Sequence, residues 1–355
     1  MKKMLCLFLA ILLLMTSAVG CGKKTESEAV KPEGNNSEAQ PLKVAIMIEN
    51  VFGTQSFVDV ALKGCDRAVE EFGIELTKIE SVDVSNAANS LQMLVEQGMD
   101  LIIMPTNSFT DVIAEVAPKY PDVMFASLDA TVPGIDNVYS CEYKEQECGF
   151  LLGALAASIT KTGKIGWVGG IAGYTQSKYE FGYKAGAYSV NPNIEVSAVY
   201  VGSYADVNKG LEIGTALFSS GCDFVCAAAG GSSMGVFKAA EEFDGDVYCF
   251  GGADGQFHVS PEKIIASEVK TVDDVAYGII KDAVNGTFFK RAGNPEVLGL
   301  AANGVGLLYT DRNEELLNAY VTDEIRNTIV DFQNKLISGE IVAPMNEEEY
   351  KIFIG

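Results

Sequence analysis

The chain has 355 residues, of which 48% are hydrophobic and 21% are charged, and its formal net charge is −22 at pH 7. This composition is ordinary for a globular body with a sizeable core, and the length predicts about two domains. The strong negative charge argues against binding nucleic acid or anionic lipid headgroups, because both partners need cationic patches.

The N-terminal stretch predicts an export signal followed by a tether. Residues 1–20 combine two lysines with an apolar run at 5–15 that is too short to span a membrane. The small residues 18–20 before Cys21 resemble a bacterial lipobox, which implies cleavage before Cys21 and its acylation; an ordinary secretory signal is the alternative. Residues 21–41 have almost no large apolar side chain and predict a flexible tether. We therefore expect a protein held by lipid on the extracytoplasmic face of the cell membrane.

The cysteines after Cys21 are predicted to be mostly free thiols. They are Cys65, Cys141, Cys148, Cys222, Cys226 and Cys249. Most lie within apolar helix or strand patterns, where a free cysteine behaves as a small buried hydrophobic residue. The even count in an exported protein leaves disulfides as the alternative. The single histidine, His258, is distant from Cys222 and Cys226, so we expect neither a metal site nor a cofactor.

After the tether, strand and helix patterns alternate. Apolar runs typical of buried parallel strands occupy residues 42–49, 74–79, 101–104 and 123–128. Apolar residues that recur every three or four positions predict helices between them, at 56–72, 87–97 and 109–119. This alternation predicts βαβ units on a parallel sheet, and therefore one α/β lobe.

Residues 137–161 predict the first crossing to a second lobe, because a strand at 137–141 runs into a helix that is apolar on nearly all sides. The pattern then repeats, with strands predicted at 164–168, 195–201, 223–227 and 247–250. Helices are predicted between them at 178–189, 207–219 and 234–243. A strand at 263–269 and a helix at 272–284 are predicted to return to the first lobe. A strand at 304–309 is predicted to recross, followed by helices at 314–320 and 323–337.

The expected fold is therefore α/β with two lobes, each a parallel sheet flanked by helices. The predicted boundaries are 42–141 plus 258–295 for lobe 1, and 142–257 plus 296–355 for lobe 2. Ligands of open α/β sheets bind beyond the carboxyl ends of the strands. The residues there are Glu49, Asn50, Thr106, Asn107, Asp129, Gly169, Gly170, Gly230, Gly231 and Asp254. No nucleophile–base pair, Walker loop or GxSxG motif accompanies them, which favours a binding protein with no catalytic residue over an enzyme.

Several segments, in a fixed order, indicate a family. They are KVAIMIENVFGTQSFVDVALKG, FASLDA, NVYSCEYKEQECGFLLGALAA, GKIGWVGG, YVGSYADVNKG, AAAGGSSMGVFKAAEE and ASEVKTVDDVAYGIIKD. Across residues 42–308, their order and spacing resemble the basic membrane protein (BMP) family. The resemblance implies a lipoprotein with the type I periplasmic binding protein fold, which holds a nucleoside, preferably a purine nucleoside, for an ABC transporter. The implied partners are the nucleoside, the permease subunits and the membrane, and we expect a monomer.

The resemblance also implies which residues contact the ligand. Phe57 matches an aromatic residue that stacks on the base, although the same helical spacing suits a core phenylalanine. Asp129 matches a strand-end aspartate that faces the ligand. Asp254 and Lys270 match an aspartate and a lysine that reach the sugar. A turn where the backbone approaches the ligand closely is matched by Gly230 and Gly231.

Two departures from the family pattern leave the ligand open. Thr54 stands where the family has an acid, and Val58 stands where it has an asparagine. Asn50 or Glu49, just upstream, is expected to supply the lost polarity. The alternatives are the same fold binding a sugar, a nucleobase or a signal molecule, and a sensor that presents its ligand to a membrane receptor. A nucleoside hydrolase that uses Asp129 and Asp254 is a further alternative.

Overall fold

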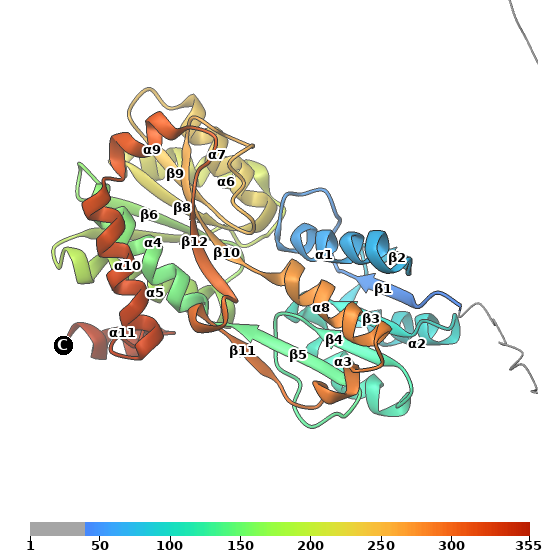
Figure 1. Cartoon of the computed structure of the whole chain (residues 1–355). Helices are drawn as coiled ribbons and strands as arrows, with labels where there is room; N and C mark the ends of the chain where they lie inside the picture. The colour runs from blue at the N-terminus through green and yellow to red at the C-terminus, as the bar shows by residue number, and fades with distance from the viewer. Residues whose placement is uncertain (1–39) are drawn as a thin grey trace, which may run out of the picture. The chain divides into compact units, whose positions relative to one another are not determined.

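The computed structural model of the protein describes residues 40–355 (Figure 1). The predicted signal sequence, Cys21 and all but the end of the predicted tether lie outside the described residues. The described residues form two six-stranded sheets with helices packed on both faces. Within this part of the chain, no helix combines the length and the apolar character that crossing a bilayer requires.

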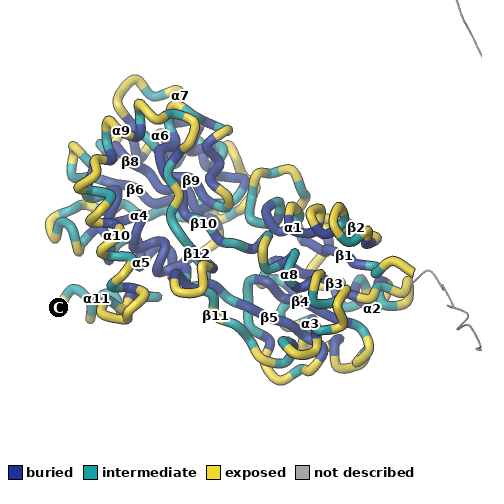
Figure 2. Tube along the Cα trace, viewed as in Figure 1, coloured by how far each residue is buried: buried dark blue, intermediate teal, exposed yellow. Residues whose placement is uncertain are grey.

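The first sheet has the strand order β11-β5-β4-β3-β1-β2, and all its pairs are parallel. Its strands are β1 (Lys43–Met47), β2 (Glu75–Ile79), β3 (Leu101–Met104), β4 (Met124–Ser127), β5 (Val138–Tyr143) and β11 (Glu296–Leu298). Its helices are α1 (Phe57–Phe72), α2 (Ala87–Glu96), α3 (Thr110–Val116) and α8 (Val272–Val284). The central strands are buried along their whole length (Figure 2), as continuous apolar runs predict for a sheet covered on both faces.

The second sheet has the order β12-β10-β9-β8-β6-β7 and is parallel except for β12, which runs antiparallel to β10. Its strands are β6 (Lys164–Gly169), β7 (Glu195–Tyr200), β8 (Phe224–Ala228), β9 (Tyr248–Gly251), β10 (Ile264–Lys270) and β12 (Val305–Tyr309). Its helices are α4 (Glu145–Ile159), α5 (Tyr174–Val190), α6 (Val207–Ser219) and α7 (Ser233–Glu242), followed by α9 (Glu314–Tyr320), α10 (Asp323–Ser338) and α11 (Glu347–Ile354). Short 3-10 turns lie at Val84–Asn86, Asn107–Phe109, Ala117–Lys119, Gly230–Ser232, Phe288–Lys290 and Leu300–Ala302.

Strand pairing corrects the lobe boundaries expected from the sequence. Strand β10 pairs with β9 and β12, so residues 264–270 belong to the second lobe rather than the first. Strand β11 pairs with β5, so residues 296–298 belong to the first lobe rather than the second. Lobe 1 also extends to Tyr143, the end of β5. An apolar run predicts a buried strand but not the sheet that the strand joins, because pairing depends on distant partners. The chain therefore crosses between the lobes three times, after β5, β10 and β11.

Helices α4 and α5 pack against each other through glycines that leave no room for a side chain. A Cβ atom on Gly153 would lie 1.9 Å from the carbonyl oxygen of Tyr183, and one on Gly186 would lie 1.9 Å from that of Phe150. The two backbones can therefore approach closely only because these positions are glycine. This close packing explains why α4 is buried on nearly every side, as its composition predicts.

The six cysteines of the described region are buried and unpaired, which confirms the expectation of free thiols. Burial raises the pKa of the Cys65 and Cys141 thiols to about 12. Because the thiolate is the reactive form, these cysteines are chemically inert in the folded protein.

Candidate functional site

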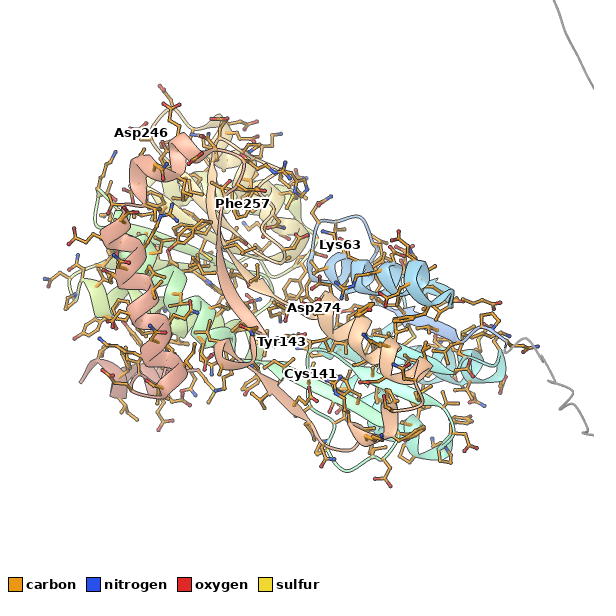
Figure 3. The ribbon with its side chains drawn as sticks, in the orientation of Figure 1. Lys63, Cys141, Tyr143, Asp246, Phe257 and Asp274 are labelled. Carbon is orange, nitrogen blue, oxygen red and sulfur yellow. The ribbon has the colours of Figure 1, made fainter. Side chains whose placement is uncertain are left out.

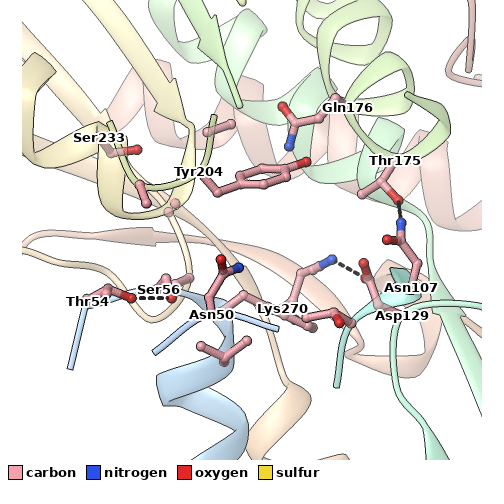
Figure 4. A pocket seen from close by; sticks show the side chains of 18 of the residues that line it. Asn50, Thr54, Ser56, Asn107, Asp129, Thr175, Gln176, Tyr204, Ser233 and Lys270 are labelled. Atoms are coloured by element: carbon pink, nitrogen blue, oxygen red, sulfur yellow. Dashed lines mark hydrogen bonds and ion pairs between the residues drawn. The ribbon is translucent and has the colours of Figure 1, made fainter. Parts of the chain in front are cut away.

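A cavity of about 450 Å³ lies between the two lobes, beyond the carboxyl ends of their strands (Figure 4). This volume falls within the range of small-molecule sites. The first lobe contributes Glu49, Asn50, Val51, Thr54, Ser56, Phe57, Val58, Ser81, Thr106, Asn107, Ser108 and Asp129. The second lobe contributes Thr175, Gln176, Tyr179, Tyr204, Ala205, Ala227, Ala228, Gly230, Ser233, Gly252, Ala253, Gln256, Glu268 and Lys270.

Lys270, the last residue of β10, connects the two lobes inside the cavity. Its ammonium lies 2.6 Å from Asp129 Oδ1, two residues after β4 (Figure 4), and 3.0 Å from Glu145 Oε1, at the start of α4. It also stands 4.2 Å from the centre of the Phe57 ring. Burial works against the charged amine, but Asp129 and Glu145 outweigh it, so the pKa of Lys270 is raised. The lysine therefore stays charged while it is only 7% exposed.

Glu268 is a second buried carboxyl group in the cavity, two residues before Lys270 on the same face of β10. The Tyr179 hydroxyl donates to its Oε2 at 2.7 Å. Burial raises the pKa of Glu268 to about 7, against the opposing effects of Tyr179 and Lys270. Burial likewise raises the pKa of Asp129 to about 6, although Lys270 acts against it. Both carboxyl groups therefore titrate nearer to neutral pH than exposed ones do.

These two pKa values predict how the stability of the ligand-free protein changes with pH. Between the unfolded values, 3.8 for Asp129 and 4.5 for Glu268, and the raised folded values, the native state binds more protons than the unfolded chain. The contribution of the two groups to the free energy of unfolding is therefore largest at low pH and falls as pH rises through this window. Urea unfolding at about pH 5 and about pH 8 measures it. A Glu268→Gln variant should show a weaker pH dependence, and identical profiles would contradict the prediction.

The first-lobe wall of the cavity is polar and held together by its own hydrogen bonds. Glu49, just after β1, accepts from the hydroxyls of Thr106 and Ser108, both at 2.7 Å. Asn107, in the same loop, donates to Thr175 of the second lobe at 3.4 Å. With both hydroxyl hydrogens directed at Glu49, the Thr106 and Ser108 hydroxyls can only accept from a ligand.

Two aromatic rings line the cavity, Phe57 from the first lobe and Tyr204 from the second. Phe57 begins α1 and is held there by Asp59, whose carboxylate accepts from the backbone N–H groups of Gly53 and Ser56. Tyr204 projects from the loop after β7, and Figure 4 shows it across the cavity from Asn50. A Cβ atom on Gly170 would lie 2.1 Å from the Tyr204 ring, so the ring depends on glycine at that position.

Four residues at the site adopt the left-handed backbone region although none is glycine. They are Gln55 (φ 59°), Ser81 (φ 57°), Ala253 (φ 61°) and Gln256 (φ 49°). Such strained residues gather at ligand sites, where the surrounding structure holds them in place. Gln256 accepts from the N–H of Gly252 at 2.9 Å and donates to the carbonyl of Gln55 at 2.6 Å. Its side chain thus ties the second lobe to the first.

The structure places most of the predicted ligand-binding residues in one cavity. Its lining includes Asn50, Phe57, Asp129, Gly230 and Lys270. Their contact with a ligand remains a prediction.

Two predicted residues lie beside the cavity instead of lining it. Asp254 forms an ion pair across the lobes with Lys63, which lies on α1 (Figure 3). Gly231 is next to the lining, and a Cβ atom there would lie 3.5 Å from Thr54 Cβ.

Sequence reasoning missed Glu268 and Tyr204. The segment SEVK at 267–270 offers a signal for Glu268. Alternate residues of a strand share a face, so the predicted site residue Lys270 points to Glu268 as its neighbour.

Comparisons with known proteins agree with this architecture. A family model described as ABC transporter substrate-binding protein PnrA-like (Bmp) matches residues 42–347. Basic membrane protein A of Borreliella burgdorferi is 32% identical over 315 residues, covering 88% of this chain and 90% of that protein. Basic membrane protein D of the same species is 28% identical over 324 residues, covering 90% and 93%.

Solved structures of solute-binding proteins share the fold. An ABC transporter solute-binding protein from Aeropyrum pernix has a TM-score of 0.80 and 26% identity, covering 88% of this chain and 96% of that one. Another from Conexibacter woesei has a TM-score of 0.69 and 23% identity, covering 86% and 100%. These likenesses confirm the two-lobed periplasmic binding protein fold expected from the sequence. The chain belongs to the Bmp family, and it is an extracytoplasmic substrate-binding protein of the ABC-transporter type rather than an enzyme.

Proposed function

We propose that this protein captures a nucleoside between its lobes and delivers it to an ABC permease while held at the membrane by a lipid on Cys21. The observation that carries the proposal is one cavity that combines aromatic rings with a buried carboxylate–lysine cluster. Phe57 and Tyr204 offer faces for a base, and stacking on an aromatic ring contributes about 1–3 kcal/mol. Asp129, Glu268 and Lys270 offer acceptors and a donor for ribose hydroxyls.

The charges of the cavity favour a nucleoside over a nucleotide. Its lining carries the acidic side chains of Glu49, Asp129 and Glu268 and the single basic side chain of Lys270. A phosphate group would meet like charges in a buried site, which costs binding energy. Hydroxyl and N–H donors of an uncharged ligand suit the same carboxylates.

Contacts from both lobes favour a closed form. The ligand cavity draws lining residues from each lobe, so a ligand gains its full set of contacts only when the lobes are together. Two further contacts join the lobes and so stabilise the closed form. They are the hydrogen bond from the Gln256 side chain to the Gln55 carbonyl and the ion pair between Lys63 and Asp254. Three chain crossings between the lobes suit a hinge motion of this kind.

A thermal-shift screen of residues 40–355 tests the nucleoside proposal. A ligand that binds only the native state adds about 2.7 kcal/mol at 100 times its dissociation constant, which raises the melting temperature by a few degrees. We expect such a rise with nucleosides. Free ribose and free bases serve as matched controls and should give smaller shifts, because each fills only part of the cavity. A rise in melting temperature with sugars alone would contradict the proposal. So would the absence of a rise with every nucleoside tested.

A sugar is the second candidate, and the cluster of Asp129, Glu268 and Lys270 is the observation that favours it. These groups lie close together and can accept from and donate to adjacent hydroxyls of any small sugar. An arabinose-bound carbohydrate transporter protein from Agrobacterium radiobacter shares the fold with a TM-score of 0.59 and 16% identity. The ribose arm of the screen separates the two candidates.

The lipid anchor has its own test. A Cys21→Ser variant removes the thiol that the lipobox-like sequence offers for acylation. We expect the variant to move from the membrane fraction to the soluble fraction and to lose labelling by radioactive palmitate. A matched Cys65→Ser variant, which changes a buried thiol of the globular body, should keep the label. Continued labelling of the Cys21→Ser protein would overturn the proposal.

A further inference from the structure

Two buried charges stand directly behind the cavity and do not line it. Glu145 is the first residue of α4 and is 1% exposed, and Lys178 lies in the second turn of α5 and is 3% exposed. Keeping such charges away from water is costly unless each has a partner. Glu145 and Lys178 therefore each need a partner of opposite charge close by.

The partners form one series of alternating charge. Asp129 contacts Lys270 at 2.6 Å, and Lys270 contacts Glu145 Oε1 at 3.0 Å. The other carboxylate oxygen of Glu145 lies 2.6 Å from the ammonium of Lys178. Lys178 also donates to the carbonyl of Tyr143 at 2.7 Å, where β5 ends and the chain crosses between the lobes (Figure 3).

This series divides the contacts of Lys270 between the cavity and its rear wall. With Lys178 in place, each oxygen of Glu145 has its own cation, so one lysine need not satisfy the whole carboxylate. Without Lys178, Lys270 would be the only cation in contact with Glu145. The cost of a half-paired buried carboxylate would then draw the Lys270 ammonium away from Asp129 and the cavity.

We propose that Lys178 is a positioning residue for ligand recognition. By neutralising Glu145 from behind, it keeps the Lys270 ammonium directed at Asp129 and at the ligand. Its bond to the Tyr143 carbonyl fixes the first crossing relative to the second lobe at the same time. The inference rests on the proposed function in so far as the ligand contacts Lys270.

A double-variant experiment separates positioning from a purely structural ion pair. Lys178→Met removes the rear cation and leaves Glu145 charged, whereas Lys178→Met combined with Glu145→Gln removes both charges. We expect the single variant to bind the nucleoside identified by the screen at least about tenfold more weakly than the unmodified protein, and the double variant to recover to within about threefold. Lys184→Met is the matched control, because Lys184 pairs with Glu180 on the same helix and neither lines the cavity. It should leave the affinity unchanged.

Two outcomes of the binding experiment would overturn the inference. They are unchanged affinity in the folded Lys178→Met protein, and a double variant that binds as weakly as the single one. Circular dichroism and thermal unfolding establish that each variant is folded.

A ligand-free readout keeps this inference distinct from the nucleoside proposal. The side-chain ammonium signal of Lys270 in a ¹⁵N-lysine NMR spectrum is assigned by its loss in Lys270→Met. It should shift in Lys178→Met and return towards its original position in the double variant. Absence of that shift would overturn the inference even if nucleosides bind, whereas failure of every nucleoside to bind would overturn the proposed function alone.

Discussion

Replacing Lys270 by methionine is expected to lower the free energy of unfolding by about 3–5 kcal/mol and to remove measurable nucleoside binding. The change leaves Asp129 without its cation and Glu145 with only Lys178. Losing one partner strands a buried charge, and that desolvation cost, more than the lost attraction, sets the magnitude. Urea unfolding and isothermal titration calorimetry measure the two effects.

An exposed ion pair provides the control for this substitution. Lys119→Met breaks a pair with Glu115 in which both side chains are more than half exposed. Water and salt screen such pairs, so we expect a change of no more than about 1 kcal/mol. Equal losses of unfolding free energy in the Lys270 and Lys119 variants would contradict the argument that burial makes the ion pairs of Lys270 strong. The loss in Lys270→Met should also shrink in acid, because protonated carboxyls no longer need the cation.

Replacing Gly153 by alanine is expected to destabilise the protein by about 3 kcal/mol, although the change adds only a methyl group. The added carbon would lie 1.9 Å from the backbone oxygen of Tyr183, so helices α4 and α5 must move apart. No side-chain rotation relieves a collision between a Cβ atom and a backbone oxygen. Thermal and urea unfolding of the purified variant measure the loss.

Gly278→Ala is the matched control, since Gly278 also lies within a helix, α8. A Cβ atom there would meet only Arg291 Nη1, at 3.9 Å. Alanine is the better helix former, so this variant should be more stable by about 0.5–1 kcal/mol. A Gly153→Ala protein as stable as the Gly278→Ala protein would show that the α4–α5 contact is looser than the structure has it.

Much of the fold could be predicted from the sequence because local patterns determine it. Continuous apolar runs gave strands such as β3, and three- and four-residue spacing gave helices such as α1. The sheet that a strand joins is not local information. Residues 264–270, which overlap a predicted strand, and residues 296–298, where no strand is predicted, are assigned to the wrong lobes, because their partners, β9 and β5, are set by the folded arrangement of the whole chain.

The candidate site was predictable where its residues follow strands. Asn50 and Asp129 stand at strand ends, and both line the cavity. Glu268 was missed because it lies inside an apolar strand, where its one signal is that Lys270, two residues later, shares its face of β10. Tyr204 was missed because its position depends on how a loop folds back onto Gly170. Residues of this kind become visible only once the tertiary contacts are known.

The buried, unreactive cysteines have a practical consequence for following closure in solution. A thiol introduced at an exposed rim position such as Lys63→Cys would be far more accessible to maleimide dyes than the six native thiols of residues 40–355. A single fluorophore could then be attached to a protein of residues 40–355 without first removing these six cysteines. Because Lys63 pairs with Asp254 across the lobes, the emission of a dye at this position would report on the separation of the two lobes. The labelled protein thereby becomes a reagentless fluorescent sensor for its own ligand.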